Sequence, residues 1–116
     1  QSPVLLQRRA LDVQAITKAV QADLAADWPT AQLAGLAHLS AQRFHVRWQE
    51  LTGRTPQQWL RDLRLDAASR ALAAGEPLET TALRCGYSSA SALAYALKRD
   101  RGVGSRSLRR QVPLER

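Results

Sequence analysis

Several residue types that support other classes of protein are scarce in this sequence of 116 residues. It has one cysteine, Cys85, and two histidines, so it can form no internal disulfide and offers too few ligands for the usual four-ligand zinc site. A single cysteine fits a reducing compartment. Its apolar runs are far shorter than the roughly 20 residues that span a bilayer. The sequence also shows no paired carboxylates and no nucleophile beside a base. We therefore expect that the protein is not an enzyme and binds no cofactor or metal ion.

Val and Ile are also scarce, and this scarcity indicates the fold class. Together they number seven, against eighteen Leu and twenty Ala. Leu and Ala favour helices, whereas β-branched residues favour strands. Hydrophobic residues make up 45% of the chain, which is enough to form a core at this length. We therefore expect an all-α domain.

Positive charge is concentrated in the later part of the chain. Residues 1–39 hold three basic and three acidic side chains, whereas residues 40–116 hold fourteen and seven, which accounts for the whole net charge of +7. Clustered Lys and Arg bind polyanions by releasing counterions from phosphates, so nucleic acid is the first candidate partner. A basic composition that serves only to keep the protein soluble explains the charge equally well. An anionic membrane surface is a weaker candidate, because no basic interfacial helix is visible.

Capping residues and glycines divide the chain into short helices. Thr55 and Gln58 form a capping box with Pro56 at the first helical position. The predicted helices cover about 13–25, 30–39, 41–52, 56–74, 77–84, 89–101 and 105–111. The predicted caps are Asp12, Thr30, Ser40, Thr55 and Ser88 or Ser89, and the predicted terminators are Gly53, Gly75, Gly86 and Gly102.

Helical spacing of the apolar residues predicts which positions face the interior. Arg61, Arg64 and Arg70 are expected on other faces. The predicted inward residues are Ile16, Val20, Leu24, Leu33, Leu36, Ala37, Phe44, Trp48, Leu51, Trp59, Leu60, Leu63, Ala67, Ala71, Leu72, Leu93 and Leu97. Cys85 is expected to pack and not to react.

A weak internal repeat appears when the sequence is shifted over itself by 49 residues. Ser40 then matches Ser89, Phe44 matches Leu93, and the glycine after each helix also matches. Each copy consists of a short helix, a tight turn and a longer helix, which is typical of a helix-turn-helix. Two such units in a basic chain favour DNA binding.

Two signatures in the sequence resemble the AraC/XylS family of transcription regulators. The first is Thr52-Gly53-Arg54-Thr55-Pro56-Gln57-Gln58-Trp59-Leu60, continued by Leu63-Arg64-Leu65-Asp66-Ala67-Ala68. The second is Cys85-Gly86-Tyr87-Ser88-Ser89-Ala90-Ser91 with Lys98-Arg99. The resemblance spans residues 13–110 and implies seven helices in two helix-turn-helix subdomains joined by a long central linker helix. It implies that each subdomain inserts one helix into successive major-groove segments.

The resemblance also implies a division of the chain. Residues 11–54 are expected to form the first helix-turn-helix subdomain, 55–75 the linker helix and 76–112 the second subdomain. Residues 1–10 are expected to be a linker from a missing N-terminal region, and 113–116 a tail.

The resemblance places base-reading side chains opposite the core face of each second helix. In the first subdomain Gln can pair with adenine, His can donate to guanine, and Val can touch a thymine methyl group. The family often has Arg at the positions of Val46 and Tyr95, and the second helix is poor in donors, so we expect the second subdomain to add mainly backbone affinity. For Tyr95 a core position is the alternative. The predicted base-reading residues are Gln42, His45, Val46, Gln49, Ser91 and Tyr95.

Phosphate contacts are expected from helix N-termini and from flanking cations. An ordinary solvated surface charge is the alternative for each arginine. The predicted phosphate-binding residues are Ser40, Arg43, Arg61, Ser89, Lys98 and Arg99, and Arg47 lies on the same flank as Arg43.

Together these features predict the sequence-specific, double-stranded DNA-binding domain of a bacterial transcription regulator. We expect a cytoplasmic protein that associates with the nucleoid, with promoter or operator DNA as its partner and RNA polymerase as a further partner expected from the family. An effector or dimerisation domain is expected outside this chain. The alternative function is a protein-interaction module of the same fold with weak non-specific DNA binding.

Overall fold

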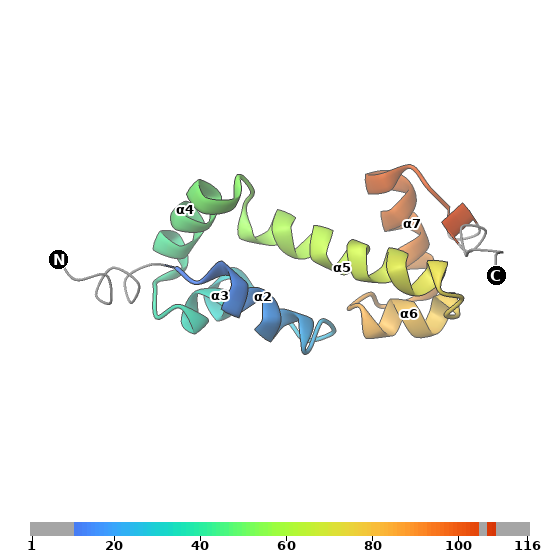
Figure 1. Ribbon diagram of the computed structural model, residues 1–116, viewed down its shortest axis with the longest axis horizontal. Helices are drawn as coiled ribbons and strands as arrows, with labels where there is room; N and C mark the ends of the chain where they lie inside the picture. The colour runs from blue at the N-terminus through green and yellow to red at the C-terminus, as the bar shows by residue number, and fades with distance from the viewer. Residues whose placement is uncertain (1–10, 105–106, 109–116) are drawn as a thin grey trace. The chain divides into compact units, whose positions relative to one another are not determined.

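The computed structural model describes residues 11–104 and 107–108, and these residues form an all-α fold with no strand among them (Figure 1). Six helices lie in this part of the chain, not the seven that we expected. They are α2 (Val13–Gln21), α3 (Thr30–Leu36), α4 (Ala41–Thr52), α5 (Pro56–Ala73), α6 (Leu78–Arg84) and α7 (Ala90–Arg101). Of the expected seventh helix, 105–111, only Ser107 and Leu108 are described, and both are helical.

The described chain divides into two compact units. The first contains residues 11–23 and 28–60, and the second contains 24–27 together with the described residues from Arg61 onward. The boundary falls inside α5, after Leu60. In the first unit α3 packs against α4, and in the second unit α6 packs against α7. Each unit therefore contains one short helix followed by one longer helix.

The helix starts follow the predicted capping chemistry at four positions. The side chains of Asp12, Ser40 and Ser89 each accept a hydrogen bond from the backbone N–H three residues later, at 2.9–3.2 Å. Thr55 and Gln58 bond reciprocally, because each side chain accepts from the other residue's backbone N–H. Each bond satisfies an N–H that the first turn of a helix otherwise leaves free.

Several of the predicted helix boundaries were wrong, including the end of the second helix, which lies at Leu36 and not near Leu39. Thr30 is the first residue of α3, and Pro29 holds the cap position without any side-chain hydrogen bond. Proline's fixed φ suits this position without a capping oxygen. The first helix ends at Gln21 and not near Ala25, because the chain turns over residues 22–25. Leu24 is nevertheless buried as predicted.

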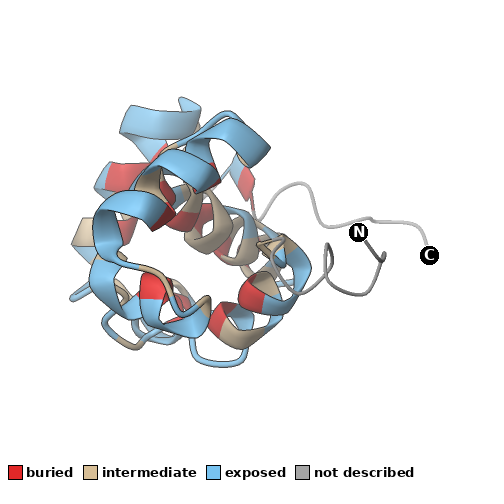
Figure 2. Cartoon of the chain, turned by 90° about the vertical axis from the view of Figure 1, so that its left-hand side faces the viewer, coloured by how far each residue is buried: buried red, intermediate tan, exposed pale blue. Residues whose placement is uncertain are grey.

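The core of the first unit is built around aromatic side chains. Phe44 and Trp48 are fully buried on α4 and stack with their ring centroids 5.1 Å apart, and Trp59 meets Trp48 edge-on at 4.8 Å. Figure 2 shows buried residues among exposed ones along the helices of the chain. Leu36 and Leu51, predicted to face inward, are 42% and 51% exposed. Both lie in the last turn of their helices, beyond the reach of the core.

The core of the second unit is aliphatic. Cys85 is fully buried in it, as predicted, and burial raises the pKa of its thiol. Leu93 and Leu97 are also buried, in agreement with the sequence. The cluster consists of Leu65, Ala68, Leu72, Ala82, Cys85, Leu93, Ala96, Leu97 and Leu108.

Arg64, which was expected only to lie away from the inward face of its helix, forms hydrogen bonds that the sequence did not predict. It is half-buried, and its Nε and Nη2 donate to the carbonyl oxygens of Leu24 and Ala26 at 3.1 and 2.8 Å. Gly86, with φ +94°, lies directly against this arrangement: a Cβ there would be 2.8 Å from Arg64 Nε and 2.9 Å from the Leu24 oxygen. The second unit therefore requires glycine at position 86.

The two helix-turn-helix copies differ by one residue in the turn. The first helices, α3 and α6, are 48 positions apart, whereas α4 and α7 are 49 apart. Both first helices end with the same hydrogen bond, from a backbone N–H to the carbonyl five residues earlier. The residue before that N–H has positive φ in each copy: it is His38 at +58° in the first and Gly86 in the second. His38 therefore adopts a backbone conformation that residues other than glycine seldom adopt.

Candidate nucleic-acid interface

The outer face of α4 carries the predicted base-reading residues of the first unit. Phe44 and Trp48 lie four residues apart and are both buried, so they fix the inner face of α4, and the residues on the opposite side of the helix point outward. Gln42 and Gln49 are exposed, His45 is half-buried, and Val46 is 49% exposed. This face therefore presents amide, imidazole and methyl groups, which can contact the edges of bases in a major groove.

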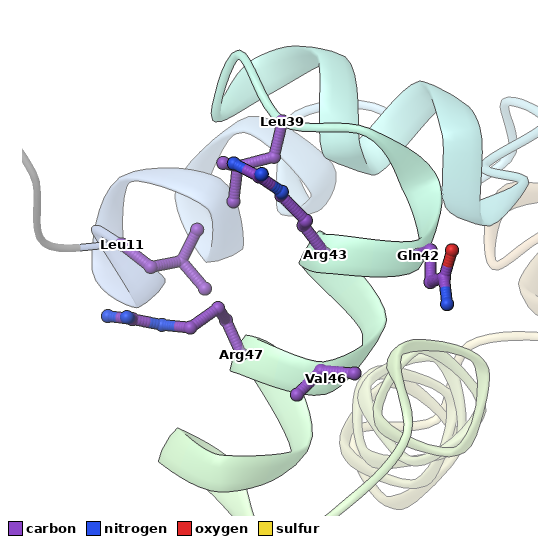
Figure 3. Close-up of a pocket in the computed structure, with 6 residues that line it drawn as sticks. All are labelled: Leu11, Leu39, Gln42, Arg43, Val46 and Arg47. Carbon is purple, nitrogen blue, oxygen red and sulfur yellow. The ribbon is translucent and has the colours of Figure 1, made fainter.

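Two arginines lie one helical turn apart on the flank of this face. Arg43 and Arg47 line a shallow pocket of about 540 Å³ together with Leu11, Leu39, Gln42 and Val46. Figure 3 shows Arg43 extending toward Leu39 and Arg47 extending toward Leu11, on the side of α4 away from Gln42. Apolar side chains beneath such stems support them while the charged ends stay in water. Neither arginine forms an ion pair with another described residue, so both can contact phosphate.

The equivalent face of α7 is different in chemistry. Ser91 is exposed and Tyr95 is 65% exposed, which makes a core position for Tyr95 wrong. Lys98 is exposed beyond them on the same helix. The hydroxyl oxygens of Ser40 and Ser89 are already used as helix caps, so their hydroxyl hydrogens are what they can offer a phosphate.

The arginines at the end of α7 are held by carboxylates. Nε and Nη2 of Arg99 donate to the two carboxylate oxygens of Asp100 at 2.8 and 3.0 Å, and the guanidinium lies 5.3 Å from the centre of the Tyr95 ring. Arg101 bonds Asp66 at 2.9 Å and lies 3.5 Å from Asp62. Arg61, the predicted phosphate contact on α5, is exposed. Sequence reasoning missed Asp100, although its position next to Arg99 was the available signal.

No cluster of His, Cys, Asp and Glu in the described ranges could hold a metal ion. Among the same residues no helix is both long and apolar enough to cross a membrane.

Comparison with known proteins identifies the family. A sequence model of a helix-turn-helix domain matches residues 33–111, a range that begins within α3 and contains α4, α5, α6 and α7. An AraC-like transcription regulator of Streptomyces antibioticus is 35% identical over 82 residues. This chain belongs to the AraC family of helix-turn-helix domains. The match covers 70% of this AraC-family chain but only 27% of the length of the Streptomyces protein.

Solved structures agree with this assignment. The DNA-binding domain of AdpA, a global transcriptional factor crystallised with a target DNA, is 28% identical with a TM-score of 0.73, covering 83% of this chain and 87% of that one. A transcriptional regulator with an AraC-type DNA-binding domain from Chromobacterium violaceum is 18% identical with a TM-score of 0.79, covering 97% and 99%. The second likeness shows the AraC-family fold.

Proposed function

We propose that this chain is the sequence-specific, double-stranded DNA-binding domain of an AraC-type transcription regulator. The observation that carries the proposal is the outer face of α4, which follows a tight turn and presents Gln42, His45 and Gln49. Beside them lie two arginines that pair with no acidic side chain in the described part of the chain. Gln can form two hydrogen bonds with adenine and His can donate to guanine. Arginines on the flank add affinity for the phosphate backbone without regard to sequence.

The second unit is proposed to use α7 in the next segment of the major groove. Successive segments on one face of DNA are about 34 Å apart. The continuous α5 spans 18 residues, or about 27 Å at ~1.5 Å per residue, and in this proposal it is the central linker helix. If this linker is short of the groove repeat, the DNA bends or α7 enters less deeply.

The domain boundaries that we predicted, 11–54, 55–75 and 76–112, belong to the same proposal. Because this chain spans 27% of the Streptomyces relative, we infer that a regulator of this kind also has an effector or dimerisation region elsewhere. Contact with RNA polymerase, a location in the cytoplasm at the nucleoid, and the lack of enzymatic activity complete the proposal.

Selection of binding sites from random duplexes at several salt concentrations tests it. We expect one preferred motif with its strongest bases in one segment and weaker ones about 10 base pairs away. Replacing Gln42 and His45 with Ala should lower the preference about tenfold or more, since a bidentate base contact contributes ~1–3 kcal/mol. Gln32→Ala, on the exposed side of α3, is the matched control and should change nothing.

A second variant separates backbone contacts from base contacts. Arg61→Ala should weaken binding to all duplexes alike and lower the slope of log affinity against log salt by about 1. If Gln42, His45 and Arg61 could all be replaced without effect on preference or slope, the proposed interface would be wrong.

The alternative is a protein-interaction module with weak DNA binding. Arg99 and Arg101 of α7 favour this alternative, because they pair with the carboxylates of Asp100 and Asp66, and paired cations release few counterions. Selection that recovers no preferred motif from random duplexes would support this alternative.

A further inference from the structure

Three neighbouring side chains on α7 form one connected group: Tyr95, Arg99 and Asp100. The Arg99 side chain points back along the helix, so that its guanidinium lies 5.3 Å from the centre of the Tyr95 ring. Asp100 accepts two hydrogen bonds from one edge of the same guanidinium. Tyr95 is one of the predicted base-reading residues and is 65% exposed. The guanidinium of Arg99 therefore lies toward the predicted reading face and not out on the flank, where we had placed it as a phosphate contact.

The hydrogen bonds to Asp100 leave a defined part of Arg99 free. A guanidinium has five N–H groups, and the carboxylate takes one from Nε and one from Nη2. Both N–H groups of Nη1 and one of Nη2 remain. These define the end of the planar fork, the edge that donates two hydrogen bonds to O6 and N7 of guanine.

Restraint is what distinguishes this arginine from an ordinary surface cation. An unrestrained arginine loses rotamer entropy when it binds, whereas a stacked and paired one has already lost much of it. The pKa of Asp100 is lowered, first by its hydrogen bonds with Arg99 and also by the nearby positive charges of Arg61 and Arg101. The carboxylate is therefore ionised throughout the neutral range and can accept both hydrogen bonds from Arg99 at physiological pH.

We propose that Arg99 is a guanine-reading residue of the second helix-turn-helix, with Asp100 and Tyr95 as the residues that position it. This inference rests on the proposed function, because it assigns a base to the second unit of a DNA-binding domain. It also changes the expectation for α7: the second unit then discriminates one base pair, although its helix is otherwise poor in donors. A phosphate contact needs only charge, whereas guanine readout needs the planar fork.

The experiment uses this difference between charge and shape. Arg99→Lys keeps the charge and removes the fork, and Arg70→Lys, at an exposed position of α5 without an assigned role, is its matched control. Asp100→Asn removes the carboxylate that binds Arg99. Its matched control is Glu79→Gln, which removes a negative charge at an exposed position of α6. Binding sites are selected from random duplexes with the wild-type chain, and affinities are then measured for the selected site, for variants with each guanine replaced, and for a scrambled duplex.

We expect the preference for one guanine to fall about tenfold in Arg99→Lys, while affinity for the scrambled duplex changes less than twofold. Asp100→Asn should lower the same preference, and the double variant should lose no more than Arg99→Lys alone, since both act through one contact. The two controls should match the wild type. Unchanged circular dichroism spectra and melting temperatures would show that the exposed variants fold normally.

Other outcomes would overturn the inference. If Asp100→Asn tightened binding to every duplex alike and Arg99→Lys had no effect, Arg99 would be a phosphate contact that Asp100 neutralises. If a motif were selected but no α7 variant altered it, this inference would fail while the proposed function stood. If the wild-type chain selected no motif at all, both would fail together.

Discussion

Replacing Gly86 with alanine should destabilise the second unit more than any other glycine-to-alanine change at a helix end in that unit. Two independent terms contribute. The first is the backbone, because φ at position 86 is +94° and an L-residue in the left-handed region costs about 1–2 kcal/mol. The second is steric, since the new Cβ would lie 2.8 Å from Arg64 Nε and 2.9 Å from the Leu24 oxygen.

The steric part of the lost stability depends on which neighbouring atoms must move to make room for the new Cβ. Arg64 is flexible and can shift, but it then weakens its hydrogen bonds to the carbonyls of Leu24 and Ala26. Hydrogen bonds from a charged donor contribute about 1.5–3 kcal/mol each, and water replaces part of that at a half-buried site. We therefore expect a total loss of about 3 kcal/mol in the free energy of unfolding.

Gly75 provides the matched control for this prediction. It also has positive φ, +96°, also follows a helix of the second unit, and is also followed by an N–H that bonds the carbonyl five residues back. Nothing lies within 4 Å of its added Cβ, so Gly75→Ala should show the backbone term alone, about 1–2 kcal/mol. Urea denaturation followed by circular dichroism measures both variants. Equal losses would refute the steric argument, and so would an unchanged loss for Gly86→Ala in an Arg64→Ala background.

Two further predictions concern stability. His38→Gly should raise the free energy of unfolding of the first unit by roughly 0.5–1 kcal/mol, because relief at φ +58° exceeds the added chain entropy; a melt that shifts downward would contradict this. Hydrogen bonds from Arg84 lower the pKa of Glu76 below its ordinary value of 4.5, so its contribution is complete above that value and is lost as the pH falls through the lowered pKa. The melting-temperature difference between wild type and Glu76→Gln should therefore be constant near neutral pH and shrink below about pH 4.5, and a difference independent of pH would refute the role of the charge.

Local chemistry made much of this fold predictable from the sequence. The caps at Ser40 and Ser89 were correct because each depends on atoms within three residues. Helical spacing likewise identified Phe44 and Trp48, since a central turn of an amphipathic helix faces the core whatever the rest of the chain does. The prediction for Leu51 was wrong, because this residue is half exposed in the last turn of α4, where spacing alone does not show whether the core reaches.

Interactions between distant residues could not be predicted in this way. Arg64 contacts carbonyls 38 and 40 positions away, and neither spacing nor charge marks it out from the exposed Arg61 and Arg70. The role of α5 was also difficult to predict, because Leu60 contributes to one core and Leu65 to the other. A helix that serves two cores has apolar residues around much of its circumference, which weakens the periodic signal.

Most of the candidate site residues are exposed, but the partners of Arg99 were not foreseen. Gln42 and Gln49 face outward because the buried aromatics fix the rotation of α4. The orientation of Arg99 depends on Asp100 and Tyr95 together, which spacing alone does not determine. That these residues read bases stays a prediction that the selection experiments test.

The placement of the aromatic core has a practical consequence. The three tryptophans of the chain, Trp28, Trp48 and Trp59, all belong to the first unit, and the second unit has none. Intrinsic indole emission therefore reports the melting of one half of the protein, while an ellipticity signal sums over both halves. Recording the two signals in the same titration separates the transitions of the halves without attaching a dye or cutting the chain.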